Sequence, residues 1–345
     1  MIVRDCLPLT VLVGGFFGDE GKGKIASYLA LRDDIDIAVR TGSVNAGHTV
    51  VVNDVKYKLR LIPSAFVNKR TRLLIGPGAN INPKIFFDEI NKLSVVDRVG
   101  VDPMCSIIEE KHILEDRGSK FLSKKIGTTG QGVGPAIEER VRRTAKLAKD
   151  IPELRPFITD VPLEVNNALD RGKKVLIEGT QGLFLSLYHG TYPFVTSRDT
   201  SASAVCSEVG IGPKRVDHVI IVFKAYVTRV GGGPLIGELP KEEVLKRGWL
   251  EKATVTGRIR RVAPFNLTMA KRAIMINSAT QIALTKLDVL YPDAKSIREY
   301  EKLPRKAKRF IEMIEKQLRV PVTLIGTGED VNDIIDRRIE LNVSP

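Results

Sequence analysis

The stretch LTVLVGGFFGDEGKGKIASYLAL, residues 9–31, decides the fold class. Leu9–Val13 is apolar and rich in β-branched residues, and it ends at Gly14-Gly15, a pattern that predicts a buried strand. Ile25–Leu31 predicts the start of a helix. A strand, a glycine-rich turn and a helix in this order are typical of a phosphate-binding loop or a dinucleotide-binding unit.

The turn between them, GDEGKGKI at residues 18–25, has the G-x4-G-K spacing of a phosphate-binding loop. Ile25 stands where such loops carry the Ser or Thr that binds Mg²⁺. The turn instead carries Asp19, a charged oxygen ligand suited to Mg²⁺. Its glycines let backbone N–H groups face a polyphosphate, and Lys22 and Lys24 add positive charge. A glycine-rich surface turn is the alternative, which the flanking strand and helix make the weaker interpretation.

Further apolar runs predict more buried strands. They are Arg72–Ile75, Lys174–Ile177, His218–Phe223, Ile282–Thr285 and Val322–Ile325. Buried strands separated by helical segments indicate an α/β fold with a mostly parallel central sheet and helices on both faces. Phe310, Met313, Ile314 and Leu318 have helical spacing, with basic residues opposite. Since no linker or repeat is evident, we expect one domain over residues 1–345, with long loops and a nucleotide site like that of P-loop GTPases.

The composition limits the possible partners and setting. The chain has 345 residues, with 54 Lys and Arg against 41 Asp and Glu, which gives a net charge of +13 and predicts anionic partners. The cysteines at 6, 105 and 206 are too few and too far apart for a disulfide framework, which favours a reducing, cytoplasmic setting. No apolar run approaches the roughly 18 residues of a transmembrane helix, and the N-terminus lacks the pattern of a signal peptide, so we expect no membrane partner.

The string Thr285-Lys286-Leu287-Asp288 directly follows a predicted strand. A carboxylate at a strand end can accept two hydrogen bonds from guanine N1–H and its 2-amino group, and adenine cannot supply that pair. The lysine stem can cover the face of the base. Alone, the string suits an ordinary turn at a strand end. Together with a phosphate-binding loop, it indicates recognition of guanine.

Three more segments are candidates for ligand contacts. GSVNAGHT at 42–49 surrounds His48 with small residues, although a lone histidine is more often structural. GTTGQGVGPA at 127–136, followed by several arginines, suits a hydrogen-bonding loop over an anion or a flexible solvent loop. TVTGRIRR at 254–261 places alternate arginines on one side of an extended segment, where they can bind carboxylate or phosphate or remain solvated.

Taken together, these motifs resemble the adenylosuccinate synthetase family. The matching pieces, in chain order, are GDEGKGK, NAGHT, GTTGQGVGPA, EGTQG, HGTYPFVTS, KAYVTRVGGGP, TGRIRR and TKLDVL, with a weaker GTG at 326–328. They run from residue 14 to residue 290 and so cover nearly the whole chain. The chain is shorter than most of the family between 143 and 174 and between 291 and 320, and it resembles the compact form of the enzyme.

The resemblance implies a carbon–nitrogen ligase with the reaction IMP + L-aspartate + GTP → adenylosuccinate + GDP + phosphate. This is the first committed step from IMP to AMP, and it proceeds through 6-phosphoryl-IMP. Asp19 would take the N1 proton of IMP, Lys22 would supply charge, and His48 would donate a hydrogen bond or proton to the phosphate. One Mg²⁺ per subunit would bind Asp19 and the carbonyl of Gly47.

The resemblance also implies a set of contacts for each substrate. GTP would contact Gly18, Asp19, Glu20, Gly21, Lys22, Gly23, Lys24, Gly47, His48, Thr49, Arg260, Lys286, Leu287, Asp288, Gly326, Thr327 and Gly328. IMP would contact Asp19, Asn45, Ala46, Gly47, His48, Thr129, Gln181, Thr196, Arg258 and, from the neighbouring subunit of a homodimer, Arg143. Aspartate would contact Thr254, Val255, Thr256, Gly257, Arg258, Ile259 and Arg260.

Three residues depart from the family pattern. Val255 replaces a usual Thr and removes one hydroxyl contact to aspartate. Ile259 lies between the arginines, where we expect it to point away from the ligand. Glu329 follows Gly328 where a proline is usual.

Two other functions compete with the ligase. A GTPase switch would share the phosphate loop and the TKLD string, but Ile25 and the arginine segments disfavour it. The net charge of +13 also suits a nucleic-acid binder, yet the basic residues are scattered and lack interleaved aromatics, so we expect no nucleic-acid partner.

Overall fold

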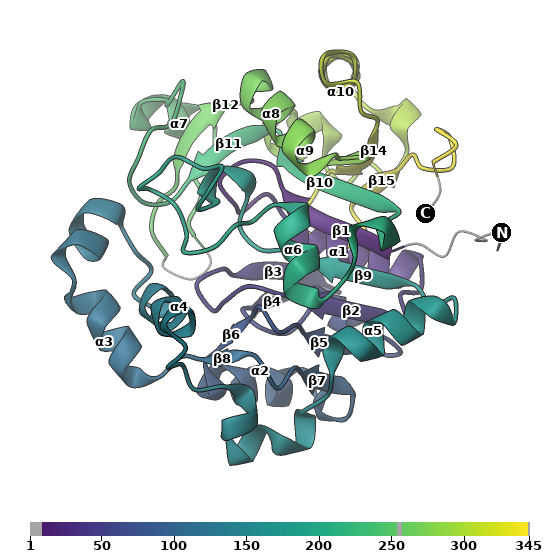
Figure 1. Cartoon of the computed structure of the whole chain (residues 1–345). Coiled ribbons are helices and arrows are strands. Elements are labelled where there is room, and N and C mark those ends of the chain that lie inside the picture. Colours follow the sequence, from purple (N-terminus) through teal and green to yellow (C-terminus); the bar gives the residue numbers. More distant parts are fainter. Residues whose placement is uncertain (1–8, 254–256, 344–345) are drawn as a thin grey trace.

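The computed structural model describes residues 9–253 and 257–343. Within these ranges, nine strands form one central sheet in the order β15-β14-β13-β10-β1-β9-β2-β5-β7 (Figure 1). All neighbouring pairs are parallel except β14 and β15. The strands are β1 (Leu9–Gly14), β2 (Ile37–Arg40), β5 (Arg72–Ile75), β7 (Val99–Val101), β9 (Val175–Glu178), β10 (His218–Lys224), β13 (Gln281–Thr285), β14 (Val322–Gly326) and β15 (Ile334–Asp336). Every predicted strand is present, with ends that agree within one residue, so the predicted mostly parallel sheet is confirmed.

Helices cover both faces of this sheet because its strands are apolar on both sides. In β1, Val11 and Val13 pack into one hydrophobic cluster and Leu12 packs into another. The first cluster includes α5 (Val161–Asp170) and α6 (Ala202–Val209), which lie in front of the strands in Figure 1, together with α8 (Leu267–Asn277) and α10 (Arg305–Leu318). The second includes α1 (Lys22–Arg32) and α2 (Pro83–Leu93).

The smaller elements lie around the sheet. The remaining α-helices of the described ranges are α3 (Glu110–Gly118), α4 (Val133–Arg142), α7 (Lys241–Lys246) and α9 (Leu287–Leu290). Antiparallel pairs form between β3 (His48–Val52) and β4 (Val55–Leu59) and between β11 (Tyr226–Arg229) and β12 (Arg261–Pro264), and β6 (Asn80–Ile81) pairs in parallel with β8 (Ser106–Ile107). None of the helices in the described ranges is both long and apolar enough to cross a bilayer.

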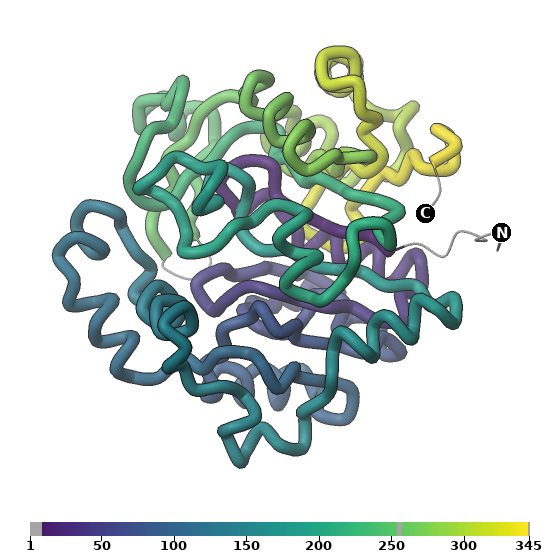
Figure 2. Tube along the Cα trace, in the orientation of Figure 1, coloured from purple at the N-terminus to yellow at the C-terminus, as the bar shows by residue number. Residues whose placement is uncertain are grey.

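The sheet brings distant loops to one edge. In Figure 2 the purple segment that includes β1 runs through the middle of the molecule, between teal and green segments from much later in the chain. Six parallel strands end on the same side, at Gly14, Arg40, Glu178, Lys224, Thr285 and Gly326. Loops that follow the carboxyl ends of parallel strands form the usual ligand-binding edge of such sheets.

Candidate active site

Two adjoining cavities lie at this edge. The first has a volume of about 210 Å³ and the second about 610 Å³. Four residues that the sequence singled out line both cavities, namely Asp19, Lys22, Gly47 and His48; Ala253 is the fifth shared residue. Two ligands bound side by side would therefore meet at this junction.

The phosphate-binding loop owes its shape to three left-handed residues, Gly18, Asp19 and Gly21, and to a buried carboxylate. Gly21 has φ 94°, and α1 begins directly after it, three residues before the predicted start at Ile25. The Glu20 carboxylate is buried and accepts the backbone N–H groups of Phe16 (3.0 Å) and Gly18 (2.8 Å). Its other oxygen binds Lys22 Nζ at 2.7 Å. Glu20 therefore supports the loop from within, and only its backbone is left for the predicted nucleotide contact.

The second lysine of the loop joins it to the C-terminal part of the site. Lys24 Nζ donates to the carbonyls of Gly328 and Asp333, both at 2.7 Å. Burial lowers the pKa of Lys24 to about 8. Lys24 lines the second cavity, so its charge lies where an anionic ligand would bind.

Asp19 ends a chain of ion pairs. Its Oδ2 lies 2.9 Å from Arg260 Nε, and Arg260 is also paired with Glu251. Glu251 in turn binds Lys224 at 2.8 Å. Although burial opposes its ionisation, Lys224 and Arg260 hold the pKa of Glu251 far below its ordinary value. The Asp19 side chain keeps 25% exposure, so it can reach a ligand in either cavity.

His48 begins β3 and faces the junction. Its Nδ1 is hydrogen-bonded to Glu178 Oε1, while Nε2 is buried and has no hydrogen-bond partner in the described part of the chain. Burial, followed by the positive charge of Arg40, lowers the pKa of His48 to about 4. Burial therefore favours the neutral ring.

The first cavity collects four of the residues predicted to bind IMP. Gln181 Nε2 donates to Thr196 Oγ1 (3.1 Å) and lies 3.5 Å from Asn45 Oδ1. Thr129 also lines this cavity. These residues come from four separate segments, which the sheet edge brings together.

Helix α3 holds the loop that carries Thr129. The Asp116 carboxylate accepts the backbone N–H of Gly132 at 2.9 Å, and Arg117 Nε donates to the Gly130 carbonyl at 3.1 Å. Because the loop is rich in glycine, these contacts restrict a segment whose backbone would otherwise be free to move.

The predicted guanine site contains a carboxylate without a partner. Asp288 Oδ1 is buried and has no hydrogen-bond partner among the described residues, and burial raises the pKa of Asp288. Lys286 and Gly328 line the second cavity nearby. A Cβ at Gly328 would lie 2.2 Å from Asp333 Oδ2, so only glycine fits there. Leu287 and Thr327 are fully buried and line neither cavity.

Some predicted contacts lie outside the cavities. Arg258 is exposed and donates to the carbonyls of Gly127 and Thr128, both at 2.8 Å, which ties the arginine segment to the loop over the first cavity. Ile259 is 50% exposed and lines neither cavity, as expected. Arg143, at the end of α4, is exposed and lines neither cavity. Thr254, Val255 and Thr256 lie outside the described residues.

The sequence reasoning missed several buried charges that hold these groups. Glu251 and Lys224 fix Arg260, and Glu178 and Arg40 lie behind His48. Of these residues, only Glu178 could have been identified from the sequence, because it directly follows a predicted strand within the EGTQG motif.

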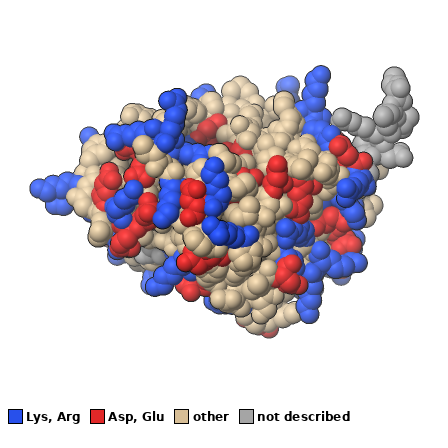
Figure 3. Space-filling view, turned by 60° about the horizontal axis from the view of Figure 1, so that its bottom comes forward, with Lys and Arg blue, Asp and Glu red and all other residues tan. Residues whose placement is uncertain are grey.

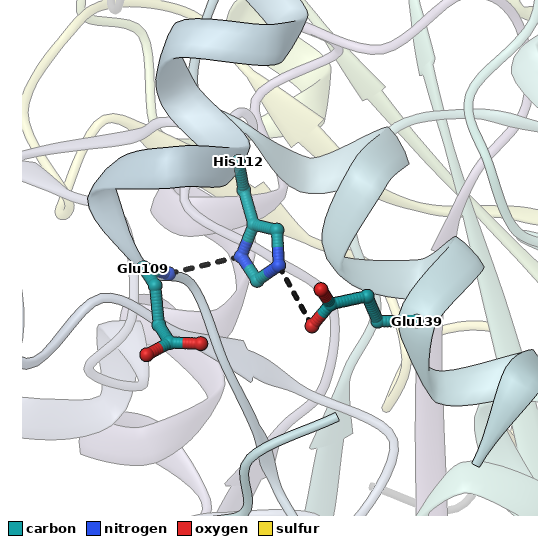
Figure 4. Close-up of side chains that lie close together, drawn as sticks. All are labelled: Glu109, His112 and Glu139. Carbon is teal, nitrogen blue, oxygen red and sulfur yellow. Dashed lines mark hydrogen bonds and ion pairs between the residues drawn. The ribbon is translucent and has the colours of Figure 1, made fainter. Parts of the chain in front are cut away.

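Glu109, His112 and Glu139 form a cluster of metal-ligand type apart from the cavities (Figure 4). His112 Nδ1 accepts the backbone N–H of Glu109 at 3.0 Å, so the ring hydrogen is on Nε2, which lies 3.0 Å from Glu139 Oε2. A metal on Nε2 would move that hydrogen to Nδ1, against the Glu109 N–H group. Lys111 already neutralises Glu139 at 2.7 Å. The cluster is therefore a structural joint between α3 and α4.

Comparisons with known proteins agree with this geometry. A family model described as adenylosuccinate synthetase matches residues 11–153, 144–294 and 291–335. The chain is 55% identical to an adenylosuccinate synthetase of Archaeoglobus fulgidus over 96% of this chain and 98% of that protein, and 54% identical to one of Pyrococcus horikoshii over 96% and 99%. A structure of fully ligated adenylosuccinate synthetase from Plasmodium falciparum matches with a TM-score of 0.88 and 28% identity, covering 95% of this chain and 99% of that one.

Proposed function

Because the chain belongs to the adenylosuccinate synthetase family, we propose that its first cavity holds IMP and its second holds GTP. The enzyme joins IMP to L-aspartate and converts GTP to GDP and phosphate, in the synthesis of AMP. One observation carries the assignment of the cavities. Asp19, Lys22, Gly47 and His48 line both of them, so the γ-phosphate and the 6-oxygen of IMP would meet there.

The first step makes the 6-oxygen into a leaving group. The Asp19 carboxylate takes the N1 proton of IMP, and the electron pair moves onto the 6-oxygen. This oxygen attacks the γ-phosphorus, and the bond between the γ-phosphorus and the β-phosphate oxygen breaks. The products of this step are GDP and 6-phosphoryl-IMP. A carboxylate is a weak base for this proton, so the charge on the 6-oxygen must be stabilised as it forms. Lys22 Nζ at the junction is placed to do so.

The second step brings in the amino acid. The amine of L-aspartate attacks C6, the C6–O bond breaks, and phosphate leaves with the former 6-oxygen. The nitrogen and Asp19 each release a proton to solvent, which gives adenylosuccinate and restores the base. We assign the carboxylates of aspartate to segment 254–260. Arg260 supports this placement because it lines the second cavity and binds the carboxylates of Glu251 and of Asp19, the latter at the junction.

Mg²⁺ fits the oxygen atoms at the junction. The Asp19 carboxylate and the Gly47 carbonyl are hard donors, and Mg²⁺ usually binds one or two carboxylates together with phosphate oxygens and water. We propose that these two residues hold one Mg²⁺ per subunit. When bound, the ion would offset negative charge on the phosphates. The Asp19 oxygen that now pairs with Arg260 would have to be shared or released.

Three further assignments complete the proposal. The Asp288 carboxylate, whose Oδ1 has no hydrogen-bond partner among the described residues, would bind the N1–H and 2-amino groups of guanine, beside the stem of Lys286 and the loop at 326–328. The exposed position of Arg143 suits a contact with IMP in the neighbouring subunit of a homodimer. The cysteine pattern supports a cytoplasmic location.

The competing functions have less support. A GTPase switch would not need the first cavity with its converging Asn45, Gln181 and Thr196. A nucleic-acid binder would need a continuous basic surface, whereas basic and acidic side chains are interspersed on the face drawn in Figure 3.

Omitting one substrate at a time tests the proposal. Adenylosuccinate formation, followed by absorbance, should require GTP, IMP, L-aspartate and Mg²⁺ together. Phosphate release from GTP should be slow unless both IMP and aspartate are present. Comparable phosphate release from GTP alone would contradict the ligase and favour a hydrolase or switch.

A further inference from the structure

A fully buried glutamate lies directly behind His48. Glu178 ends β9, and its carboxylate has 0% exposure. Its Oε1 contacts His48 Nδ1 and the hydroxyl of Ser64, the latter at 2.6 Å. Its Oε2 accepts the backbone N–H of Ser64, also at 2.6 Å. Every contact of this carboxylate is therefore with a donor or with the imidazole.

These contacts decide which ring nitrogen of His48 carries the hydrogen. Although burial opposes ionisation, the contacts with His48, Arg40 and Ser64 hold the pKa of Glu178 below its ordinary value. An ionised carboxylate has no hydrogen to donate, so the hydrogen between it and the imidazole belongs to Nδ1. Nε2 lies on the side of the ring away from Glu178, has no hydrogen-bond partner among the described residues, and belongs to a residue that lines both cavities.

Glu178 is itself held in place from two sides. Arg40, at the end of the neighbouring strand β2, pairs with Glu178 in register, and its Nη1 lies 3.5 Å from Oε1. Arg40 is also buried, so this pair is shielded from water. Ser64 fixes the other edge of the carboxylate through both its N–H and its hydroxyl. The His48 ring thus rests on a rigid support at the sheet edge.

We propose that Glu178 is a positioning residue for the phosphoryl transfer: it accepts the Nδ1 hydrogen of His48 and so orients the ring with Nε2 as the atom that reaches the phosphate, to which Nε2 donates when it also carries a hydrogen. The inference rests on the proposed function, because it assumes that the phosphate passes the junction. It adds a residue that the sequence motifs left without a role. A buried carboxylate that holds an imidazole in one tautomer is a recurrent way to orient a catalytic histidine.

The wild-type enzyme offers a test that needs no substitution. The chain has four histidines, so ¹⁵N-labelled imidazole spectra can be assigned with the variant His48→Asn. At pH 7 we expect His48 in the Nδ1–H form. An Nε2–H form in the wild type would overturn the proposal.

Kinetics of Glu178→Gln test the functional consequence. The amide puts an NH₂ group against either Ser64 N–H or His48 Nδ1–H, so the ring must turn or change its tautomer. We expect kcat to fall about tenfold or more while the KM values for GTP and IMP change little. In a His48→Asn background the same change should cost kcat less than about twofold, because the ring on which Glu178 acts is gone.

A matched control separates positioning from simple loss of packing. Asp102 is a buried carboxylate that accepts the backbone N–H groups of Met104 (2.9 Å) and Val161 (3.1 Å) and lines neither cavity. Asp102→Asn should lower Tm and leave kcat unchanged. If Glu178→Gln does not fold, Ser64→Ala can be used instead. It removes the hydroxyl that donates to Glu178 Oε1, and it should lower kcat by less than the tenfold expected for Glu178→Gln.

The outcomes distinguish the two proposals. A wild-type protein that makes no adenylosuccinate refutes the proposed function. A wild-type protein that makes it, with a Glu178→Gln kcat equal to that of Asp102→Asn, refutes the role of Glu178 and leaves the proposed function intact.

Discussion

At the scale of single residues, Asp19 combines an unusual backbone with a chemical task. Its φ of 61° is left-handed, a conformation that Asp and Asn tolerate better than most side chains. Asp19→Asn should therefore keep the fold and Tm. Turnover should fall by about 10²-fold or more, because the amide cannot take the N1 proton. The absorbance assay for adenylosuccinate measures the loss, and activity within a few-fold of wild type would exclude Asp19 as the base.

Asp288 tests the choice of nucleotide. Its Oδ1 is buried and has no hydrogen-bond partner among the described residues, and we propose that it accepts a hydrogen from the purine. Asp288→Asn should weaken the binding of GTP and favour that of xanthosine triphosphate, whose 2-oxo group can accept a hydrogen bond from the new amide. The ratio of kcat/KM for the two nucleotides reports the switch. An unchanged preference would refute the guanine assignment.

Lys24 predicts how GTP binding varies with pH. Burial lowers the pKa of this lysine to about 8, so it is charged at pH 7 and largely neutral above pH 9. Losing that charge weakens attraction to phosphate, so the KM for GTP should rise between pH 7 and 9. The KM for IMP in the same series is the control, because Lys24 lines only the second cavity. Parallel changes in both KM values would argue against this origin.

At the scale of elements, helix α3 determines where the loop at 127–132 lies. Removing the buried acceptor with Asp116→Ala leaves the Gly132 N–H without its partner, which costs about 1–3 kcal/mol. We expect the KM for IMP to rise several-fold, since Thr129 lies on the released loop, while the KM for GTP stays near wild type. Initial-rate measurements with each substrate varied check this, and an unchanged KM for IMP would show that the loop is held without α3.

Elements were more predictable than the buried charges between them. Short apolar runs identified the strands, because a sheet covered on both faces needs apolar residues at successive positions. The left-handed Gly21 set the start of α1, which the apolar pattern placed at Ile25. The contacts of Arg258 and the ion pair between Arg260 and Asp19 join residues far apart in the sequence. Glu20 turns inward through contacts within its own loop. A local sequence pattern does not predict such contacts, although the motifs did identify which residues lie around the cavities.

At the scale of the whole molecule, the sheet contains strands from residue 9 to residue 336. Because the two cavities lie along one edge of that single sheet, we propose that the chain works as one domain. In the proposed homodimer, the second copy of the chain would add its Arg143 to the IMP site, since Arg143 lines neither cavity of its own chain.

Mixing two inactive variants tests this dimer. Asp19→Asn and Arg143→Ala should each have low activity alone. If Arg143 serves the neighbouring site, random exchange makes half of the dimers mixed, each with one intact site, so the mixture should recover about a quarter of the wild-type rate. Activity that stays at the average of the two variants would place Arg143 outside the partner's site.

The path of one oxygen atom tests the central claim, that the two cavities meet so that phosphate passes from GTP to IMP. IMP labelled with ¹⁸O at position 6 is incubated with GTP, L-aspartate, Mg²⁺ and enzyme, and the released phosphate is analysed by mass spectrometry. The account predicts that each phosphate released with adenylosuccinate carries the labelled oxygen. Phosphate without the label, at the same yield of adenylosuccinate, would contradict it.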